Sequence, residues 1–200
     1  MTGGGGWSGD LWKVPNLLTL ARIALAPVFV ALYARGHTLA ALLVFGAAAT
    51  TDFLDGLAAR LLRQHTRLGT LLDPVADKLL EMCALVALAA RGELPWWLPA
   101  LVFSRDLAQL LGALLLRGAR HRVPVAPTRI GKYATFAIVS TVLLALAEGV
   151  GALAWAAPFA AAMGLLATLC VILSWVQYAL YFVRAWREPL AADEPAGSER

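Results

Sequence analysis

Long apolar stretches separated by short polar breaks dominate the pattern along the chain. Six of these stretches, each about 19 to 30 residues long, are sufficient for a helix to cross a bilayer. They cover residues 16–34, 38–64, 69–91, 96–118, 129–148 and 157–186. Backbone groups that face lipid must be hydrogen-bonded within their own segment. The pattern therefore predicts an all-α integral membrane protein with six transmembrane helices.

Composition supports this class and excludes an ordinary soluble domain. Hydrophobic residues make up 60% of the chain and charged residues 15%, and the mean hydropathy is +0.70. A soluble globular domain has about 25% charged residues. We therefore expect one transmembrane domain over residues 13–187, between a flexible N-terminus at 1–12 and a flexible C-terminal tail at 188–200.

The distribution of positive charge predicts the orientation. With six spans both termini lie on one face, and that face carries thirteen Lys and Arg residues, against Arg35 and Arg91 on the other. Lys and Arg accumulate in cytoplasmic loops, so both termini are predicted to be cytoplasmic, at the inner membrane of the cell. The net charge of +4 indicates attraction to anionic headgroups and no nucleic-acid partner, because no basic stripe alternates with exposed aromatics.

Four aspartates interrupt the second and third apolar stretches: Asp52, Asp55, Asp73 and Asp77. A carboxylate in hydrocarbon is costly unless a partner compensates it. At about 100° per residue, Asp52 and Asp55 share one helix face, and Asp73 and Asp77 are one i+4 step apart. The short break between the stretches makes their helices antiparallel. The four carboxylates then overlap in depth, toward the cytoplasmic side.

Converging carboxylates repel one another, and a divalent cation removes that repulsion. Ligation by oxygen alone favours Mg²⁺, Mn²⁺ or Ca²⁺ over Zn²⁺, since no His or Cys joins the group. Four carboxylates suffice for two ions, or for one ion and a free base. The sequence thus predicts a metal site on the second and third helices.

Small residues and an arginine accompany the aspartates. Gly56, Ala59 and Gly69 leave room for a ligand against the helix surface, and Arg60 can reach a phosphate. These features describe a pyrophosphate site. Two plainer interpretations stay open at this point: small residues also serve helix packing, and an arginine at a span end also anchors the helix at the interface.

The spacing D-x2-D-G-x2-A-R-x8-G-x3-D-x3-D resembles in full the signature of the CDP-alcohol phosphatidyltransferase family. The residues that carry the resemblance are Asp52, Asp55, Gly56, Ala59, Arg60, Gly69, Asp73 and Asp77. The resemblance implies a membrane enzyme with six transmembrane helices, usually a homodimer. Such an enzyme transfers the phosphatidyl group of CDP-diacylglycerol to an alcohol and releases CMP.

The resemblance also implies a role for each motif residue. Asp52, Asp55 and Asp73 resemble ligands shared by two Mg²⁺ or Mn²⁺ ions, and Asp77 resembles a ligand of the second ion that also acts as the catalytic general base. The residues expected to bind the CDP-linked lipid are Asp52, Asp55, Gly56, Ala59, Arg60 and Gly69.

The acceptor alcohol must be inferred outside the motif. "VPNLLTLARI", "SRDLAQLLG" and "PTRIGKYAT" resemble both phosphatidylglycerophosphate synthases and cardiolipin synthases of this family. Arg105 is an arginine within an apolar span, which indicates a functional site or an ion pair with Asp106 or a motif carboxylate. Together with Arg129 and Lys132 it would bind an acceptor that carries a phosphate; the alternative is that these cations are interface anchors.

We expect glycerol 3-phosphate as the acceptor. The alternatives are phosphatidylglycerol, in a cardiolipin synthase, and inositol phosphate, in a phosphatidylinositol phosphate synthase. A membrane scaffold without catalysis, or a transporter that uses its carboxylates for cation passage, is the remote alternative from another functional class. Release of CMP would distinguish an enzyme of this family from a scaffold and from a transporter.

Overall fold

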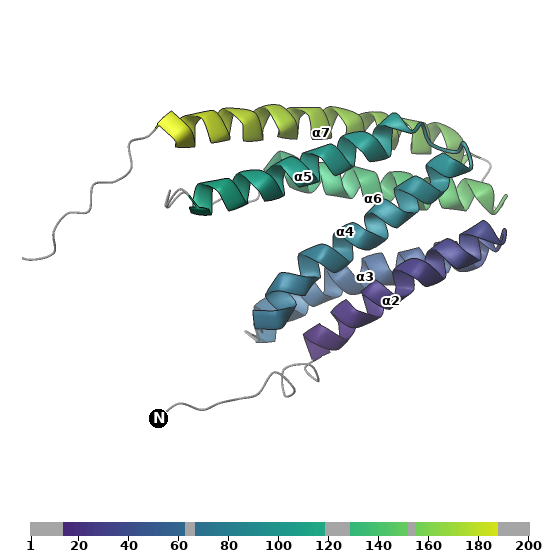
Figure 1. Cartoon of the computed structure of the whole chain (residues 1–200). Coiled ribbons are helices and arrows are strands. Elements are labelled where there is room, and N and C mark those ends of the chain that lie inside the picture. The colour runs from purple at the N-terminus through teal and green to yellow at the C-terminus, as the bar shows by residue number, and fades with distance from the viewer. Residues whose placement is uncertain (1–13, 63–66, 119–128, 152–154, 188–200) are drawn as a thin grey trace, which may run out of the picture.

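A computed structural model describes the backbone of residues 14–62, 67–118, 129–151 and 155–187 (Figure 1). Side chains are described for fewer residues, and those left out are 14–19, 52–62, 67–75, 77, 113–114, 116–118, 185 and 187. The predicted flexible ends, residues 1–12 and 188–200, lie outside the described residues.

Six α-helices make up the described part of the chain. They are α2 (Val14–Ala34), α3 (Thr38–Leu62), α4 (Arg67–Ala90), α5 (Trp97–Gly118), α6 (Arg129–Gly149) and α7 (Ala156–Arg187). The ends of these helices differ from the predicted stretches by two residues at most. The all-helical prediction is therefore confirmed for this part of the chain.

Glycine ends the first, third and fifth of these helices. Gly36, Gly92 and Gly151 have φ angles of 82°, 78° and 74°, in the left-handed region that side chains disfavour. At Gly92, its own amide donates to Ala89 O and the next amide donates to Leu88 O, which closes the helix end. The three turns lie at one end of the bundle, and α2 begins and α7 ends at the other (Figure 1).

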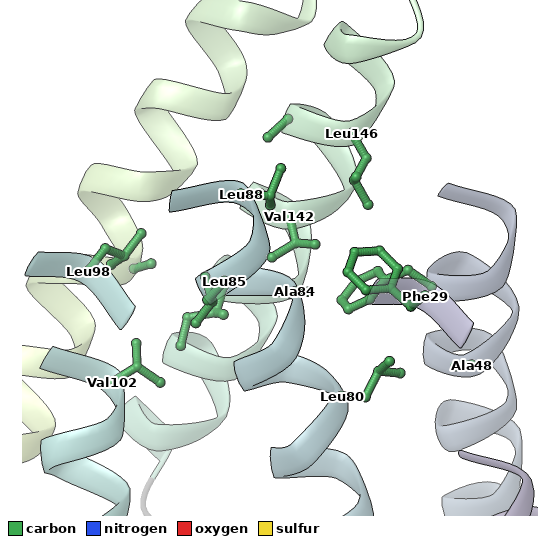
Figure 2. Close-up of a cluster of buried hydrophobic side chains, with 14 of the residues drawn as sticks. Phe29, Ala48, Leu80, Ala84, Leu85, Leu88, Leu98, Val102, Val142 and Leu146 are labelled. Carbon is green, nitrogen blue, oxygen red and sulfur yellow. The ribbon is translucent and has the colours of Figure 1, made fainter. Parts of the chain in front are cut away.

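Helix α4 occupies the middle of the bundle and packs against α2, α5 and α6. Its buried residues include Leu80, Ala84, Leu85 and Leu88, which contact apolar side chains from several helices (Figure 2). Burial of such side chains contributes roughly 25 cal/mol per Å² of apolar surface. The second half of α4 is thereby held firmly, and the motif residues precede this half on the same helix.

Helices α6 and α7 form the most extensive helix pair. The buried face of α6 is rich in small residues, including Gly131, Ala134 and Ala137. A Cβ added at Gly164 of α7 would lie 3.6 Å from Cγ2 of Thr141. Small residues let two helix backbones approach closely, which is how helices associate when lipid removes the hydrophobic drive.

The outer surface is apolar over much of its area. On α7, for example, Leu165, Leu169 and Leu173 are each more than half exposed. Among the described residues, two segments are long and apolar enough to cross a membrane, Arg129–Gly149 and Ala156–Arg184, and two shorter apolar segments are Leu20–Ala34 and Thr38–Thr51. Six helices are confirmed, and six membrane crossings stay a prediction.

The glycine turns provide a test of this fold. Gly92→Ala forces a side chain into the left-handed region, although no atom lies within 4 Å of the added Cβ. We expect its apparent Tm in detergent to fall by roughly 2–8 °C, because the left-handed conformation costs about 1–2 kcal/mol. Unfolding can be followed through exposure of the free thiols of Cys83 and Cys170.

Gly46→Ala is the matched control. Gly46 lies inside α3, and its added Cβ would meet only Leu143 Cδ2 at 3.8 Å, an ordinary contact. Alanine favours a helix over glycine by about 1 kcal/mol, so this variant should match or exceed the wild-type Tm. Equal losses in both variants would contradict the turn argument.

Candidate active site

The eight motif positions all lie on helices. Positions 52 to 60 fall in the last part of α3, and positions 69 to 77 in the first part of α4. Only residues 63–66 separate these two helices along the chain, so the end of α3 and the start of α4 are close neighbours. The predicted helical placement is confirmed, and the side chains of the eight residues lie outside the description.

The predicted metal site falls on these same positions. Within the residues whose side chains are described, no group of three or more His, Cys, Asp or Glu could hold a metal ion. Asp52, Asp55, Asp73 and Asp77 are outside that set. Their donor chemistry, carboxylate oxygen alone, fits Mg²⁺ or Mn²⁺. The metal ligands accordingly stay predictions.

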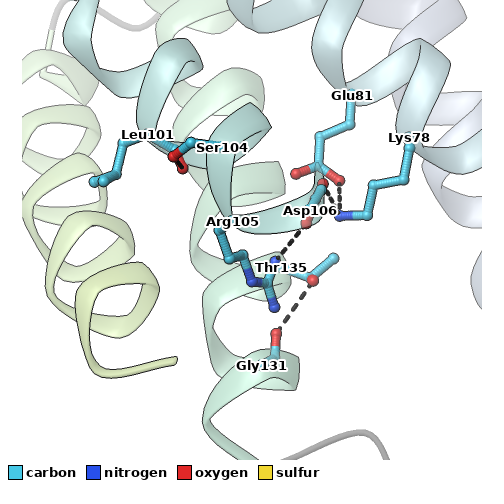
Figure 3. Close-up of polar contacts among 8 residues, drawn as sticks. All are labelled: Lys78, Glu81, Leu101, Ser104, Arg105, Asp106, Gly131 and Thr135. Carbon is cyan, nitrogen blue, oxygen red and sulfur yellow. Dashed lines mark hydrogen bonds and ion pairs between the residues drawn. The ribbon is translucent and has the colours of Figure 1, made fainter. Parts of the chain in front are cut away.

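A cluster of four charged side chains lies next to the motif, between α4 and α5 (Figure 3). Lys78 directly follows Asp77 in the chain. Its Nζ lies 3.1 Å from Oε2 of Glu81 on the same helix and 3.0 Å from Oδ2 of Asp106 on α5. Nη1 of Arg105 lies 3.2 Å from Oδ1 of Asp106. The order of contacts is Glu81, Lys78, Asp106, Arg105, so opposite charges alternate.

Burial makes these contacts important. Glu81 and Arg105 are 6% and 5% exposed, and the side chains of Asp106 and Lys78 are 17% and 39% exposed. Two cations and two carboxylates compensate one another, which lowers the cost of charge in an apolar environment. Three buried atoms of the cluster have no hydrogen-bond partner among the described residues: Oε1 of Glu81, Nε of Arg105, and Oδ2 of Asp106, which is the oxygen of the ion pair with Lys78.

The three predicted acceptor residues differ in burial, and their common pocket stays a prediction. Arg105 is buried and pairs with Asp106, which is one of the two pairings expected from the sequence. In Figure 3 its guanidinium extends toward Thr135 and Gly131 of α6. Arg129 and Lys132 begin the same helix, but both are exposed. Lys132 lies three residues before Thr135, on a neighbouring part of the helix surface, and Arg129 lies farther around α6.

Sequence reasoning gave no role to two cations that the structure singles out. Lys78 lies directly after the motif residue Asp77 and received no role of its own. Its position three residues before Glu81 on a predicted helix was the sequence signal for an ion pair. Arg22 is only 3% exposed on α2, the helix that packs against both α3 and α4. An arginine within an apolar stretch is the sequence signal for a side chain directed into the bundle.

Comparison with known proteins adds an independent line of information. Residues 12–185 match the family model described as CDP-alcohol phosphatidyltransferase. A Mycobacterium tuberculosis protein (strain H37Rv) named "Probable phosphatidylglycerophosphate synthase" is 35% identical over 183 residues, covering 88% of this chain and 83% of the relative.

Two further relatives carry two different activities in their names. A Streptomyces coelicolor protein named "Cardiolipin synthase (CMP-forming)" is 37% identical over 192 residues, covering 90% of this chain and 87% of the relative. A Bacillus subtilis protein named "CDP-diacylglycerol--glycerol-3-phosphate 3-phosphatidyltransferase" is 35% identical over 147 residues, covering 66% of this chain and 75% of the relative. The names agree on the type of reaction and differ in the acceptor.

Proposed function

Because the chain belongs to the CDP-alcohol phosphatidyltransferase family, we propose that it transfers the phosphatidyl group of CDP-diacylglycerol to glycerol 3-phosphate. The products are phosphatidylglycerophosphate and CMP. The observation that carries this proposal is the complete eight-residue signature on the consecutive helices α3 and α4. The names of the M. tuberculosis and B. subtilis relatives support the choice of acceptor.

The reaction is a direct displacement at phosphorus. The acceptor hydroxyl gives its proton to Asp77 and attacks the phosphorus that carries diacylglycerol. A new oxygen–phosphorus bond forms, the bond to the bridging oxygen breaks, and CMP leaves with that oxygen. Arg60 offsets charge on the leaving phosphate, and Gly56, Ala59 and Gly69 give the nucleotide room beside the helices. Bound Mg²⁺ or Mn²⁺, held by Asp52, Asp55, Asp73 and Asp77, would supply further charge compensation.

Arg105 supports an acceptor that bears a phosphate. It is a buried cation whose Nε has no hydrogen-bond partner among the described residues, and Asp106 contacts both Arg105 and Lys78. A phosphate beside this guanidinium would complete its hydrogen bonding. Arg129 and Lys132 are exposed at the start of α6 and would attract the anion from solution.

The membrane arrangement belongs to the same proposal. All six helices cross the inner membrane, both termini and the active site face the cytoplasm, and the protein acts as a homodimer. Exposed Trp96, Trp97 and Trp155 follow the glycine turns at one end of the bundle, and tryptophans favour the membrane interface. α5 has 22 residues, which at about 1.5 Å each span about 33 Å, close to the thickness of the hydrocarbon core.

Cardiolipin formation is the second candidate function. The S. coelicolor relative bears that name, and phosphatidylglycerol also presents a phosphate and a free hydroxyl. The deciding experiment supplies purified enzyme with CDP-diacylglycerol and, separately, glycerol 3-phosphate, phosphatidylglycerol or inositol phosphate. CMP release is measured and the lipid product is identified by mass. We expect CMP release with glycerol 3-phosphate and with neither of the other acceptors. CMP release with phosphatidylglycerol only would change the assignment to cardiolipin synthase.

Replacement of the general base tests the mechanism. Asp77→Asn should lower kcat by about 10²–10⁴-fold, because no carboxylate then takes the proton from the attacking hydroxyl. Binding of CDP-diacylglycerol should be largely kept, as measured by retention on the purified variant. Glu148→Gln is the control, because Glu148 is an exposed carboxylate on α6. Wild-type kcat in Asp77→Asn would reject the assignment of Asp77.

Removal of divalent metal tests the carboxylate set. EDTA should stop CMP release, and Mg²⁺ or Mn²⁺ added in excess should restore it, since four carboxylates without cations repel one another and the phosphates. The measurement is the initial rate of CMP release before chelation, after it and after restoration. Full activity in a thoroughly chelated sample would show that the aspartates have another role.

Truncation of the buried arginine tests the acceptor site. Arg105→Ala should raise the KM for glycerol 3-phosphate by roughly 10–100-fold, because hydrogen bonds to a charged group are worth about 1.5–3 kcal/mol. Asp106 keeps Lys78 as its partner, although one cation then faces two carboxylates. The KM for CDP-diacylglycerol should stay within about twofold. Arg105→Lys keeps the charge but loses the planar guanidinium, so its KM for glycerol 3-phosphate should lie between those of wild type and Arg105→Ala. Equal changes in both KM values would reject the acceptor role.

A further inference from the structure

We infer that the ion pair between Lys78 and Asp106 is a positioning device for phosphatidyl transfer: it sets where Asp77 on α4 lies relative to Arg105 on α5. The inference rests on the proposed function, since it concerns the two residues assigned there to the base and the acceptor. Lys78 and Asp106 touch neither substrate in this assignment. They act by fixing the two helices that carry Asp77 and Arg105.

The geometry joins the two helices through a single carboxylate. Asp106 Oδ2 lies 3.0 Å from Lys78 Nζ, and Asp106 Oδ1 lies 3.2 Å from Arg105 Nη1. Lys78 is the next residue after Asp77, so a shift of Lys78 moves the Asp77 backbone with it. Figure 3 shows Lys78 and Glu81 on one helix facing Asp106 on the other. Asp106 is therefore the link between the base side and the acceptor side.

Apolar packing holds the second half of α4, whereas the contact at Lys78 and Asp106 is made by charged groups. Farther along the same two helices, the contact is made by side chains such as Leu85, Leu98 and Val102 (Figure 2). Apolar burial is not directional, so it favours contact without selecting one register of α4 along α5. Lys78 Nζ and Asp106 Oδ2 form an ion pair at 3.0 Å, which ties the two helices at this point although that oxygen has no hydrogen-bond partner among the described residues. The Lys78–Asp106 pair thus adds to the apolar packing a tie next to the motif.

Glu81 provides a control within the same cluster. Like Asp106 it is a carboxylate that contacts Lys78, at 3.1 Å, and it is 6% exposed. Unlike Asp106 it lies on α4 itself, three residues after Lys78, so it adds no tie between helices. Neutralising either carboxylate changes the net charge of the cluster by the same amount. A difference between the two variants then reports the contacts of Asp106 with Lys78 and with Arg105, and Lys78→Met, which leaves the Arg105–Asp106 pair in place, isolates the tie between α4 and α5.

The experiment compares Asp106→Asn with Glu81→Gln in purified enzyme, using CDP-diacylglycerol and the acceptor that the wild type accepts in the panel above. Asp106→Asn should lower kcat at least tenfold while the KM for CDP-diacylglycerol stays within about twofold. Glu81→Gln should keep kcat within about threefold of wild type. Asp106→Glu, which restores the charge on a longer arm, should recover part of the lost kcat.

A double-mutant cycle tests the pairing itself. If Lys78 and Asp106 act as one unit, Lys78→Met with Asp106→Asn should be no slower than the slower single variant. Three results would overturn the inference. The first is an equal loss of kcat in Glu81→Gln and Asp106→Asn, and the second is a loss of kcat in the double variant equal to the product of the two single losses. The third is a loss of affinity for CDP-diacylglycerol that parallels the loss of kcat. If Asp106→Asn does not fold, Lys78→Met decides, and wild-type kcat in that variant overturns it. Absence of CMP release by wild type with every acceptor would instead reject the proposed function.

Discussion

Charge in an apolar bundle must be compensated locally, and the most informative parts of this molecule follow from that constraint. The described charged cluster meets it with two cations and two carboxylates in alternating contact. The motif aspartates are expected to meet it with divalent cations and substrate phosphates. Two neighbouring residues of α4 thus fall under the same electrostatic constraint: Lys78 is held by protein carboxylates, and Asp77 is the proposed general base.

The rest of the bundle supports α4 by different means. Apolar side chains fix its second half against α2, α5 and α6, while small residues bring α6 and α7 into close contact. Neither kind of packing contributes polar groups to the reaction. A proton-transfer group and an anion-binding group placed on separate helices need a defined distance between them, because small misplacements cost large factors in rate. The ion pair between Lys78 and Asp106 adds a tie between α4 and α5 next to the motif.

Much of the fold was predictable from the sequence because lipid imposes simple rules. Stretches of apolar residues gave all six helices, and glycines such as Gly36 and Gly92 fell where the breaks were expected. The motif was also placed on the correct helices, since its fixed spacing follows helical periodicity. The side-chain partners were harder to predict. Arg105 had two possible partners in the sequence, and only the packing of α5 against α4 brings Asp106 to Lys78. That packing depends on residues distant from the motif.

The placement of aromatic residues gives the molecule built-in optical markers. Trp96, Trp97 and Trp155 are all exposed at the end that carries the glycine turns, whereas Trp186 is exposed near the end of α7 on the opposite side. Indole fluorescence depends on the polarity around the ring and on nearby quenchers. Exposed tryptophans at the two ends of the bundle can therefore report on their separate surroundings by collisional quenching, once Trp7, Trp12 and Trp175 are replaced.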